Sequence, residues 1–204
     1  MSKKIDDIRI PNYVIQSNVI SEAAKFVYFI LLYYRNEKTN SCFPSQKTLA
    51  KEFGFTQKYF SKYIKELERA GLIIICKQNR GGTYKNNAYF FKNYNVERDF
   101  TLIYKDALRK VINKERSKEE LMLYIKTRRW VNNEKLIAKG LTKAQVRRYS
   151  GVTAKLMEKA WGKITDGELI TVSYRDNEFT FDMEMSFDMK QQSKRKIDIE
   201  NRGA

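Results

Sequence analysis

Two helical patterns separated by one short turn constrain the fold of this chain more than any other feature. Ser45 is placed to cap a helix over residues 46–53, and Gly54 is placed to end it. Thr56 opens a second helix, which runs until Gly71. The apolar residues of this second helix recur at the i, i+3, i+4, i+7 spacing of one buried face: Phe60, Tyr63, Ile64 and Leu67. The sequence therefore predicts two helices joined by a tight turn.

Two apolar runs follow the second helix. Residues 72–77 and 87–91 are predicted strands, and the polar, glycine-containing residues 78–86 join them into a basic hairpin. Ahead of the helix pair, Ser21 caps a further, largely apolar helix. Three helices followed by a hairpin are the order of a winged helix-turn-helix domain, which we place at residues 21–95.

The second half of the chain repeats this pattern. When Gly54-Phe55-Thr56 is aligned with Gly151-Val152-Thr153, a constant offset of 97 residues pairs apolar positions without a gap. The paired positions are Leu49 with Val146, Phe60 with Met157, Ile64 with Trp161, Leu67 with Ile164, and Leu72-Ile73 with Leu169-Ile170. Ser117-Lys118-Glu119-Glu120 is a capping-box pattern that opens the first helix of the repeat. We therefore predict a second winged helix-turn-helix domain at residues 117–189, with a tighter hairpin at its end.

Three segments lie outside the two predicted domains. Residues 1–20 form an N-terminal arm, whose alternating apolar run from Ile8 to Ile15 predicts an edge strand or extended segment. Residues 96–116 have helical spacing of their apolar residues and are predicted as a connecting helix. Residues 190–204 have little to bury and are predicted as a disordered basic tail. The predicted fold class is α+β, mainly helical, with two tandem winged helix-turn-helix domains joined by the connecting helix.

The charge of the chain indicates the class of its partner. The net charge of +16, from 40 Lys and Arg against 24 Asp and Glu, favours a polyanion. No apolar run approaches the roughly 18 residues that a membrane-spanning helix needs, and the first residues do not lead into a signal-peptide core. We therefore expect nucleic acid rather than membrane as the partner, and a cytoplasmic location.

The residue types available for catalysis are few. The chain contains no histidine, which removes the usual general base and the commonest zinc ligand. Cys42 and Cys76 are predicted to be small core hydrophobes. Neighbouring carboxylates such as Asp6-Asp7 and Glu119-Glu120 suit helix capping and solvation. We therefore expect no cofactor, no metal and no enzymatic activity.

Cations gather on one side of the second helix of each predicted domain. Four of them lie roughly 140–200° from the core direction set by Phe60: Lys58, Lys62, Lys65 and Arg69. Three lie roughly 160–240° from the direction set by Met157: Lys155, Lys159 and Lys163. In helix-turn-helix domains the second helix enters the major groove, where its N-terminal half reads base edges and outer cations neutralise phosphates. Both helices are therefore predicted to face double-stranded DNA.

The residues predicted to contact DNA fall into four groups. The candidates for base reading are Gln57, Lys58, Ser61 and Lys62. Further contacts from the first helix pair come from Ser45, Tyr59 and Lys65. The wing supplies Arg80, Thr83, Tyr84 and Lys85 for phosphate or minor-groove contacts. The second domain supplies Lys143, Arg147, Arg148, Lys155, Lys159 and Lys163. Because the first helix mixes lysines with polar and aromatic groups, we expect it to supply specificity and the second helix to supply mainly non-specific affinity.

The segment from Ser21 to Phe91 resembles the winged helix-turn-helix domains of replication initiators, replisome organisers and regulators of Gram-positive plasmids and phages. The likeness lies in Ile10-Pro11-Asn12-Tyr13, Cys42-Phe43-Pro44-Ser45, Thr48-Leu49-Ala50, Gly54-Phe55-Thr56 and the run from Ile64 to Ile73. Residues 117–185 look like a second copy, similar to tandem winged-helix regulators of conjugation operons. The resemblance implies a sequence-specific DNA-binding protein of a mobile genetic element, acting as a transcriptional regulator or as an accessory that binds an origin or transfer origin.

The sequence leaves several alternatives open. One or both winged helices could instead bind a protein, which would make the chain an interaction module of a replication or transfer complex. A homodimer and a monomer are equally compatible with the sequence, and replication or transfer proteins are candidate further partners. The operator sequence and the process served are not encoded in any motif, because the same module serves repressors, initiators and accessories.

Overall fold

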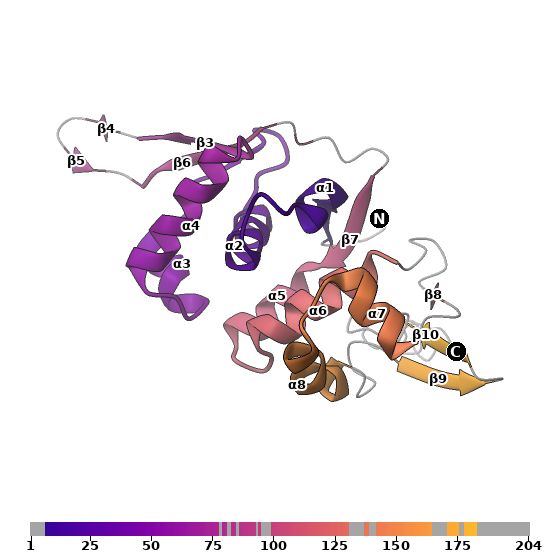
Figure 1. Cartoon of the computed structure of the whole chain (residues 1–204). Helices are drawn as coiled ribbons and strands as arrows, with labels where there is room; N and C mark the ends of the chain where they lie inside the picture. Colours follow the sequence, from indigo (N-terminus) through magenta and orange to yellow (C-terminus); the bar gives the residue numbers. More distant parts are fainter. Residues whose placement is uncertain are drawn as a thin grey trace, which may run out of the picture. The chain divides into compact units, whose positions relative to one another are not determined.

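The structure, a computed structural model, describes residues 7–77, 79–80, 83–84, 86–92, 94, 99–130, 137–138, 142–164, 171–175 and 178–182. The chain divides into two compact units. The N-terminal unit comprises Ile8–Phe100, and the C-terminal unit comprises Met1–Asp7 with Thr101–Ala204. Helices and short antiparallel sheets occur in both units, so the fold is mixed α+β as predicted (Figure 1).

The first part of the chain, up to the boundary of the units, is built from helices and short strands. Its described elements are, in chain order, β1 (Asp7–Pro11), α1 (Asn12–Gln16), α2 (Glu22–Tyr33), β2 (Ser41–Cys42), α3 (Gln46–Glu52), α4 (Gln57–Arg69), β3 (Ile73–Cys76), β4 (Asn79–Arg80), β5 (Thr83–Tyr84) and β6 (Ala88–Phe91). Helices α3 and α4 form the predicted helix-turn-helix. Strands β3 and β6, with β4 and β5 between them, form the predicted wing (Figure 1).

Local sequence determines where the three longer helices of this unit begin and end. Ser21, Ser45 and Thr56 cap α2, α3 and α4, and in each case the side-chain hydroxyl accepts a hydrogen bond from a backbone N–H of the first turn. Gly54 and Gly71 follow α3 and α4 with φ of +65° and +70°, in the left-handed region that a Cβ disfavours. These five positions are the ones that the sequence predicts, and the predicted helix-turn-helix is confirmed.

Helix α2 lies at the centre of the N-terminal core. Every side chain from Ala24 to Leu32 is buried, and α4 packs against this helix. The face of α4 buried there carries Phe60, Ile64 and Leu67, each at most 1% exposed, whereas Tyr63 is only half-buried. Strands β2, β6 and β3 form an antiparallel sheet with β6 in the middle. The core of α4 is thus the predicted one, with Tyr63 at its edge.

The C-terminal unit repeats this architecture. Its described elements begin with β7 (Phe100–Tyr104) at the boundary and continue with α5 (Lys105–Ile112), α6 (Lys118–Arg128), β8 (Ile137–Ala138), α7 (Lys143–Ser150), α8 (Ala154–Ile164), β9 (Thr171–Arg175) and β10 (Glu178–Asp182). The sheet order β8-β10-β9 is that of β2-β6-β3: the last strand is central, and the short strand before the helix pair lies at one edge. The described elements of the C-terminal unit therefore follow the order that the predicted second winged helix-turn-helix domain requires.

The repeat extends to single capping residues. Ser117 and Glu120 form the predicted capping box at the start of α6. Three further positions have the same structural role as the residues 97 positions earlier, namely Thr142 and Ser45 as caps, Thr153 and Thr56 as caps, and Gly151 and Gly54 as left-handed glycines. The offset found in the sequence therefore describes equivalent structural positions.

The prediction of an extended N-terminal arm is wrong for Asn12–Gln16, which form helix α1. Pro11 stands at the N-cap of α1, where a residue without a backbone N–H leaves no helical hydrogen bond unmade. The amine of Lys25 donates to the carbonyl of Ile15 at 3.0 Å and forms an ion pair with Glu22 at 2.8 Å. Because Lys25 is 4% exposed, this segment is part of the N-terminal unit rather than a separate arm.

The prediction of a connecting helix over residues 96–116 is also wrong in part. Within it, the structure describes a helix only at Lys105–Ile112, and Phe100–Tyr104 form strand β7. Alternation along β7 buries Thr101 and Ile103. The run of aromatic and β-branched residues explains the strand, because such side chains fit a pleated, half-buried surface.

One of the two cysteines departs from its prediction. Cys42 is buried in β2 as predicted, but Cys76 is exposed at the end of β3. Alternation along this strand buries Ile73 and exposes both Ile74 and Cys76, which therefore share the outer face. Residues 183–189 of the second domain and the predicted tail 190–204 lie outside the described residues.

Candidate nucleic-acid interface

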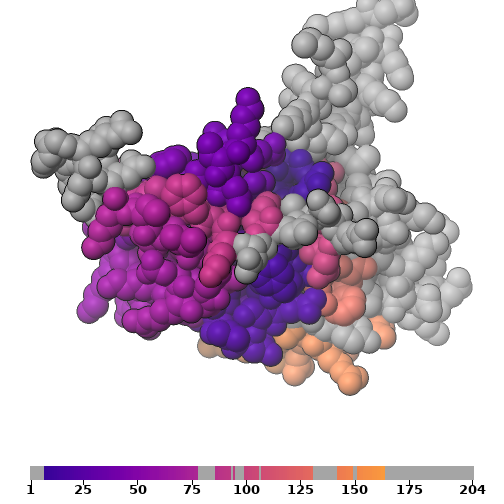
Figure 2. Space-filling view, turned by 90° about the horizontal axis from the view of Figure 1, so that it is seen from above, coloured from indigo at the N-terminus to yellow at the C-terminus, as the bar shows by residue number. Residues whose placement is uncertain are grey.

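The exposed side of α4 is a cationic surface. Lys58, Lys62, Lys65 and Arg69 are all exposed, and together with Ser61 they line a shallow hollow of about 370 Å³. None of these four cations has an ion-pair partner within the described part of the chain. In the space-filling view the residues of α3 and α4, purple to magenta, form a continuous side of the N-terminal unit (Figure 2). The positive charges of Lys58, Lys62, Lys65 and Arg69 are therefore available to an anionic ligand.

The first turn of α4 presents different chemistry. Gln57 and Lys58 are exposed, and Tyr59 is 53% exposed. The ring of Tyr59 stacks on that of Tyr63, with 6.5 Å between ring centroids and 22° between ring planes. An amide, an ammonium group and an aromatic ring are thus placed side by side at the end of the helix that is predicted to read base edges.

Two predicted contact residues have structural partners. The Ser61 hydroxyl donates to Oε1 of Gln46 at 2.7 Å, and Nε2 of Gln46 donates to the Tyr89 hydroxyl at 2.8 Å. This chain of hydrogen bonds joins α4 to α3 and to β6. Ser45 caps α3 through its side-chain oxygen. Sequence reasoning missed Gln46 and Tyr89, because only the packing of α3 against α4 brings them to Ser61.

Strands β4 and β5 pair within the segment predicted to join the two strands of the wing. Asn79 pairs with Tyr84, and Arg80 pairs with Thr83. The backbones of Arg80, Thr83 and Tyr84 therefore lie in a two-stranded hairpin. Lys85 lies outside the described residues.

Helices α7 and α8 of the C-terminal unit carry the second set of predicted contacts. Met157 and Ala160 of α8 are buried, as the predicted core direction requires. The cations on the opposite side and on α7 are exposed: Lys143, Arg147, Arg148, Lys155, Lys159 and Lys163. The cationic side of α8 is therefore present, but Lys163 has a different environment from the other two lysines of this helix.

Lys163 forms an ion pair within the unit. Its Nζ lies 3.4 Å from Oε1 of Glu120, a carboxylate that is 5% exposed, and Arg116 lies 3.8 Å from the second oxygen of the same carboxylate. Arg116 also donates to the carbonyl of Lys163 at 2.7 Å. The buried carboxylate of Glu120 therefore pairs with Lys163, whose own side chain is 62% exposed. The capping-box pattern identified Glu120, but its ion pair depends on the packing of α6 against α8.

Burial shifts the pKa values of several ionisable groups among the described residues. Burial raises the pKa of the Cys42 thiol to about 12, so this thiol is protonated at neutral pH. Burial lowers the pKa of Arg128, and Tyr124 and Tyr104 oppose that shift. No group of three metal-ligating side chains occurs among the residues that the structure describes. In the same residues, no helix is both long and apolar enough to span a membrane.

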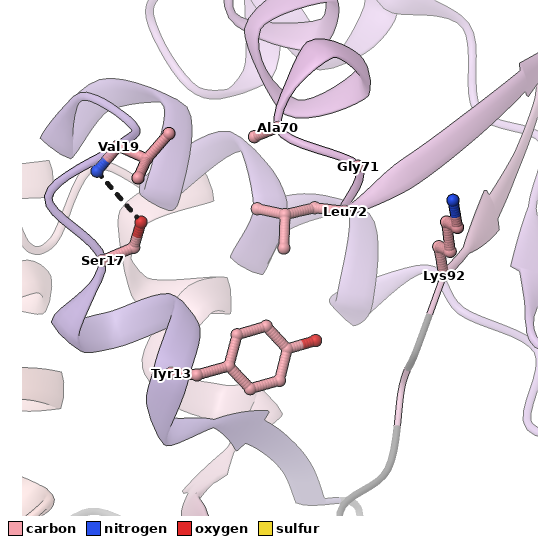
Figure 3. A pocket seen from close by; sticks show the side chains of 7 residues that line it. All are labelled: Tyr13, Ser17, Val19, Ala70, Gly71, Leu72 and Lys92. Atoms are coloured by element: carbon pink, nitrogen blue, oxygen red, sulfur yellow. Dashed lines mark hydrogen bonds between the residues drawn. The ribbon is translucent and has the colours of Figure 1, made fainter.

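A second hollow, of about 260 Å³, has a largely apolar lining (Figure 3). It lies between the α1–α2 segment and the turn after α4, and Lys92 is its one charged lining residue. Val19, at its edge, is 83% exposed, and the Val19 N–H donates to the Ser17 hydroxyl at 3.2 Å. The side chains of Tyr13 and Leu72 face each other across the hollow (Figure 3). Its lining therefore offers mainly apolar contact surface.

Comparison with known proteins supports the helix-turn-helix assignment. Residues 18–73 match a family model described as a helix-turn-helix domain. No curated protein sequence matches the chain significantly. Among solved structures, the chain is similar to one described as Pi initiator protein in complex with iteron DNA, with 14% sequence identity and a TM-score of 0.49 over 88% of this chain and 98% of that chain.

Proposed function

We propose that this chain is a non-enzymatic, sequence-specific double-stranded DNA-binding protein of a mobile genetic element, a plasmid or a phage, that acts in the cytoplasm. It serves as a transcriptional regulator or as an accessory that binds an origin or transfer origin. The observation that carries this proposal is the exposed cationic side of α4, the second helix of a helix-turn-helix.

The geometry of α4 suits the major groove. The groove is about 12 Å wide and admits one α-helix, whose first turns reach base edges. Gln57 and Lys58 occupy the first turn, and Lys62, Lys65 and Arg69 continue the same cationic side for the rest of the helix. Cations along a helix neutralise phosphates on both strands, whereas polar groups at its start discriminate bases.

A salt series tests this proposal. The logarithm of the affinity should fall steeply with the logarithm of salt concentration, by about 0.9 for each phosphate neutralised, with around six or more contacts. Lys65→Ala should make the slope shallower by about one unit. Lys38→Ala, which removes an exposed lysine from the loop after α2, is the matched control and should leave the slope unchanged. A slope between zero and about −2 contradicts engagement by both units.

Recovery of bound DNA from cells distinguishes the two roles. A site within a promoter supports the regulator, and a site within an origin or transfer origin supports the accessory. The proposed association with a mobile element rests on the resemblance of Ser21–Phe91 to plasmid and phage proteins. Chromosomal sites alone would contradict it.

A protein-interaction module is the second candidate, and the apolar hollow near Val19 favours it. In that case a replication or transfer protein, or a second copy of the chain, would occupy the exposed surface. An isotherm without affinity for any duplex at low salt would replace the first proposal with this one.

A further inference from the structure

Tyr59 is unusual among the exposed residues of α4. The other side chains on the exposed side of this helix are charged or polar, whereas Tyr59 presents a large aromatic ring that is 53% exposed. It is the third residue of the helix, after Gln57 and Lys58, and so lies in the turn that would reach base edges. An apolar surface is thus exposed where the proposed function places the bases.

The ring of Tyr59 is held in place by other aromatic rings. Its centroid lies 6.5 Å from that of Tyr63, and the ring of Tyr63 lies 5.8 Å from that of Phe55 in an edge-on arrangement. Phe55 in turn contacts Phe60, which is fully buried, at 5.9 Å. This row of rings connects the exposed Tyr59 to the core of the N-terminal unit.

A ring that is already held loses little conformational freedom on binding. Aromatic side chains have only two side-chain torsions, so they provide contact area at a low entropic cost. The stack on Tyr63 restricts both torsions further. The ring of Tyr59 therefore has a neighbour that favours its orientation before DNA arrives.

The chemistry of the major groove identifies what such a ring would contact. Adenine, guanine and cytosine present hydrogen-bond donors and acceptors at their major-groove edges, and thymine alone adds an apolar group, its C5 methyl. Burying an apolar ring against a donor or acceptor would leave that group without a partner, which is unfavourable. A methyl group against the ring has no such cost.

We propose that Tyr59 is a specificity-determining residue that contacts the C5 methyl group of a thymine in the major groove. The inference rests on the proposed function. It adds that recognition includes an apolar contact from a fixed ring, beside the polar contacts of Gln57 and Lys58.

Replacement of thymine by uracil tests the contact, because the two bases differ only by the C5 methyl. A duplex is selected from a random pool by the full chain, and each thymine in it is replaced singly by deoxyuridine. At one position, the duplex with uracil should bind about fourfold more weakly than the duplex with thymine. This factor corresponds to about 0.8 kcal/mol for one buried carbon. The Tyr59→Ala chain should bind the thymine and uracil forms of that position equally.

Two variants keep the test specific. Tyr59→Phe retains the ring and should retain the fourfold discrimination. Lys58→Ala should weaken binding of the thymine and uracil forms by the same factor, so the fourfold discrimination should remain. Thermal unfolding of each variant confirms that the fold is intact, which is expected because Tyr59 is half-exposed.

Several results would overturn the inference. They are equal binding of the thymine and uracil forms at every position by the unmodified chain, discrimination that survives in Tyr59→Ala, and loss of discrimination in Tyr59→Phe. Each of these leaves duplex binding itself in place, so the proposed function would stand. Absence of binding to any duplex would instead refute the proposed function.

Discussion

Helices α4 and α8 are the same element in two copies of one architecture, yet their surfaces differ. Helix α4 packs a buried face against α2, and α8 packs one against α6. Position 66 of α4 corresponds to position 163 of α8, and each side chain joins its helix to the start of α2 or α6. Glu66 accepts hydrogen bonds from the backbone and hydroxyl of Ser21, whereas Lys163 pairs with Glu120. Both units therefore have a side-chain link at this position, but the linking residue is acidic in α4 and basic in α8.

This difference changes what each helix offers to DNA. Four cations of α4 have no ion-pair partner in the described part of the chain. Of the three lysines of α8, Lys155 and Lys159 likewise have none there, whereas Lys163 pairs with Glu120. The polar and aromatic residues of the first turn also differ, since Gln57 and Tyr59 correspond to Ala154 and Leu156. A shared fold therefore does not imply a shared contribution to binding.

The largest effect is expected from Lys58→Ala with Lys62→Ala. Affinity for a selected site should fall much more than affinity for random DNA, because each lost base contact costs about 1–3 kcal/mol. Equilibrium titration of both DNAs across a salt series measures the two losses. Equal losses on both DNAs would remove the distinction between α4 and α8.

Glu120→Gln sharpens the comparison from the side of the C-terminal unit. Glutamine keeps the capping-box geometry but removes the charge that holds Lys163 and Arg116, so the free energy of unfolding should fall by about 1–3 kcal/mol. Chemical denaturation measures the change. Glu158→Gln, at an exposed position of α8, is the matched control and should change stability by less than about 0.5 kcal/mol. Equal stability of both variants would show that the ion pair contributes nothing.

The equivalent pair on α8, Lys155→Ala with Lys159→Ala, should have a smaller and less selective effect. Selected and random DNA should weaken by similar factors, and the salt slope should become shallower by up to about two units. Adding Lys163→Ala should change the slope little further, because this lysine already pairs with Glu120. A specific loss at the selected site would reverse the roles of the two helices.

The smallest effect is expected from Ser61→Ala. The hydroxyl donates to Gln46 inside the unit, so the variant should lose about 1 kcal/mol of stability and leave the preference for the selected site unchanged. Denaturation and competition binding test the two parts separately. A change in preference without a change in stability would restore Ser61 as a base-reading residue.

Much of the fold could be predicted from the sequence because its signals are local. Ser45, Gly54 and Thr56 specify the turn between α3 and α4 through capping and backbone geometry, and the same chemistry recurs 97 residues later. The cationic side of α4 could be predicted for the same reason, since a helix fixes the directions of its own side chains.

The errors concern contacts between elements. The helical spacing around Leu102 suggested a helix, but packing selects strand β7. The hydrogen bond from Ser61 to Gln46 and the ion pair of Lys163 with Glu120 join side chains that are far apart in sequence. Such partners are set by tertiary packing, which no periodic pattern in one chain reveals.

Lys25 gives the N-terminal unit an internal chemical reporter. Its amine is buried, bonded to Ile15 and paired with Glu22, so an acylating reagent cannot reach it while helix α1 stays in place. Exposed lysines such as Lys38 would react at once. The rate at which Lys25 becomes labelled therefore measures how often the segment around Ile15 detaches from α2, and mass spectrometry can read that rate without any change to the sequence.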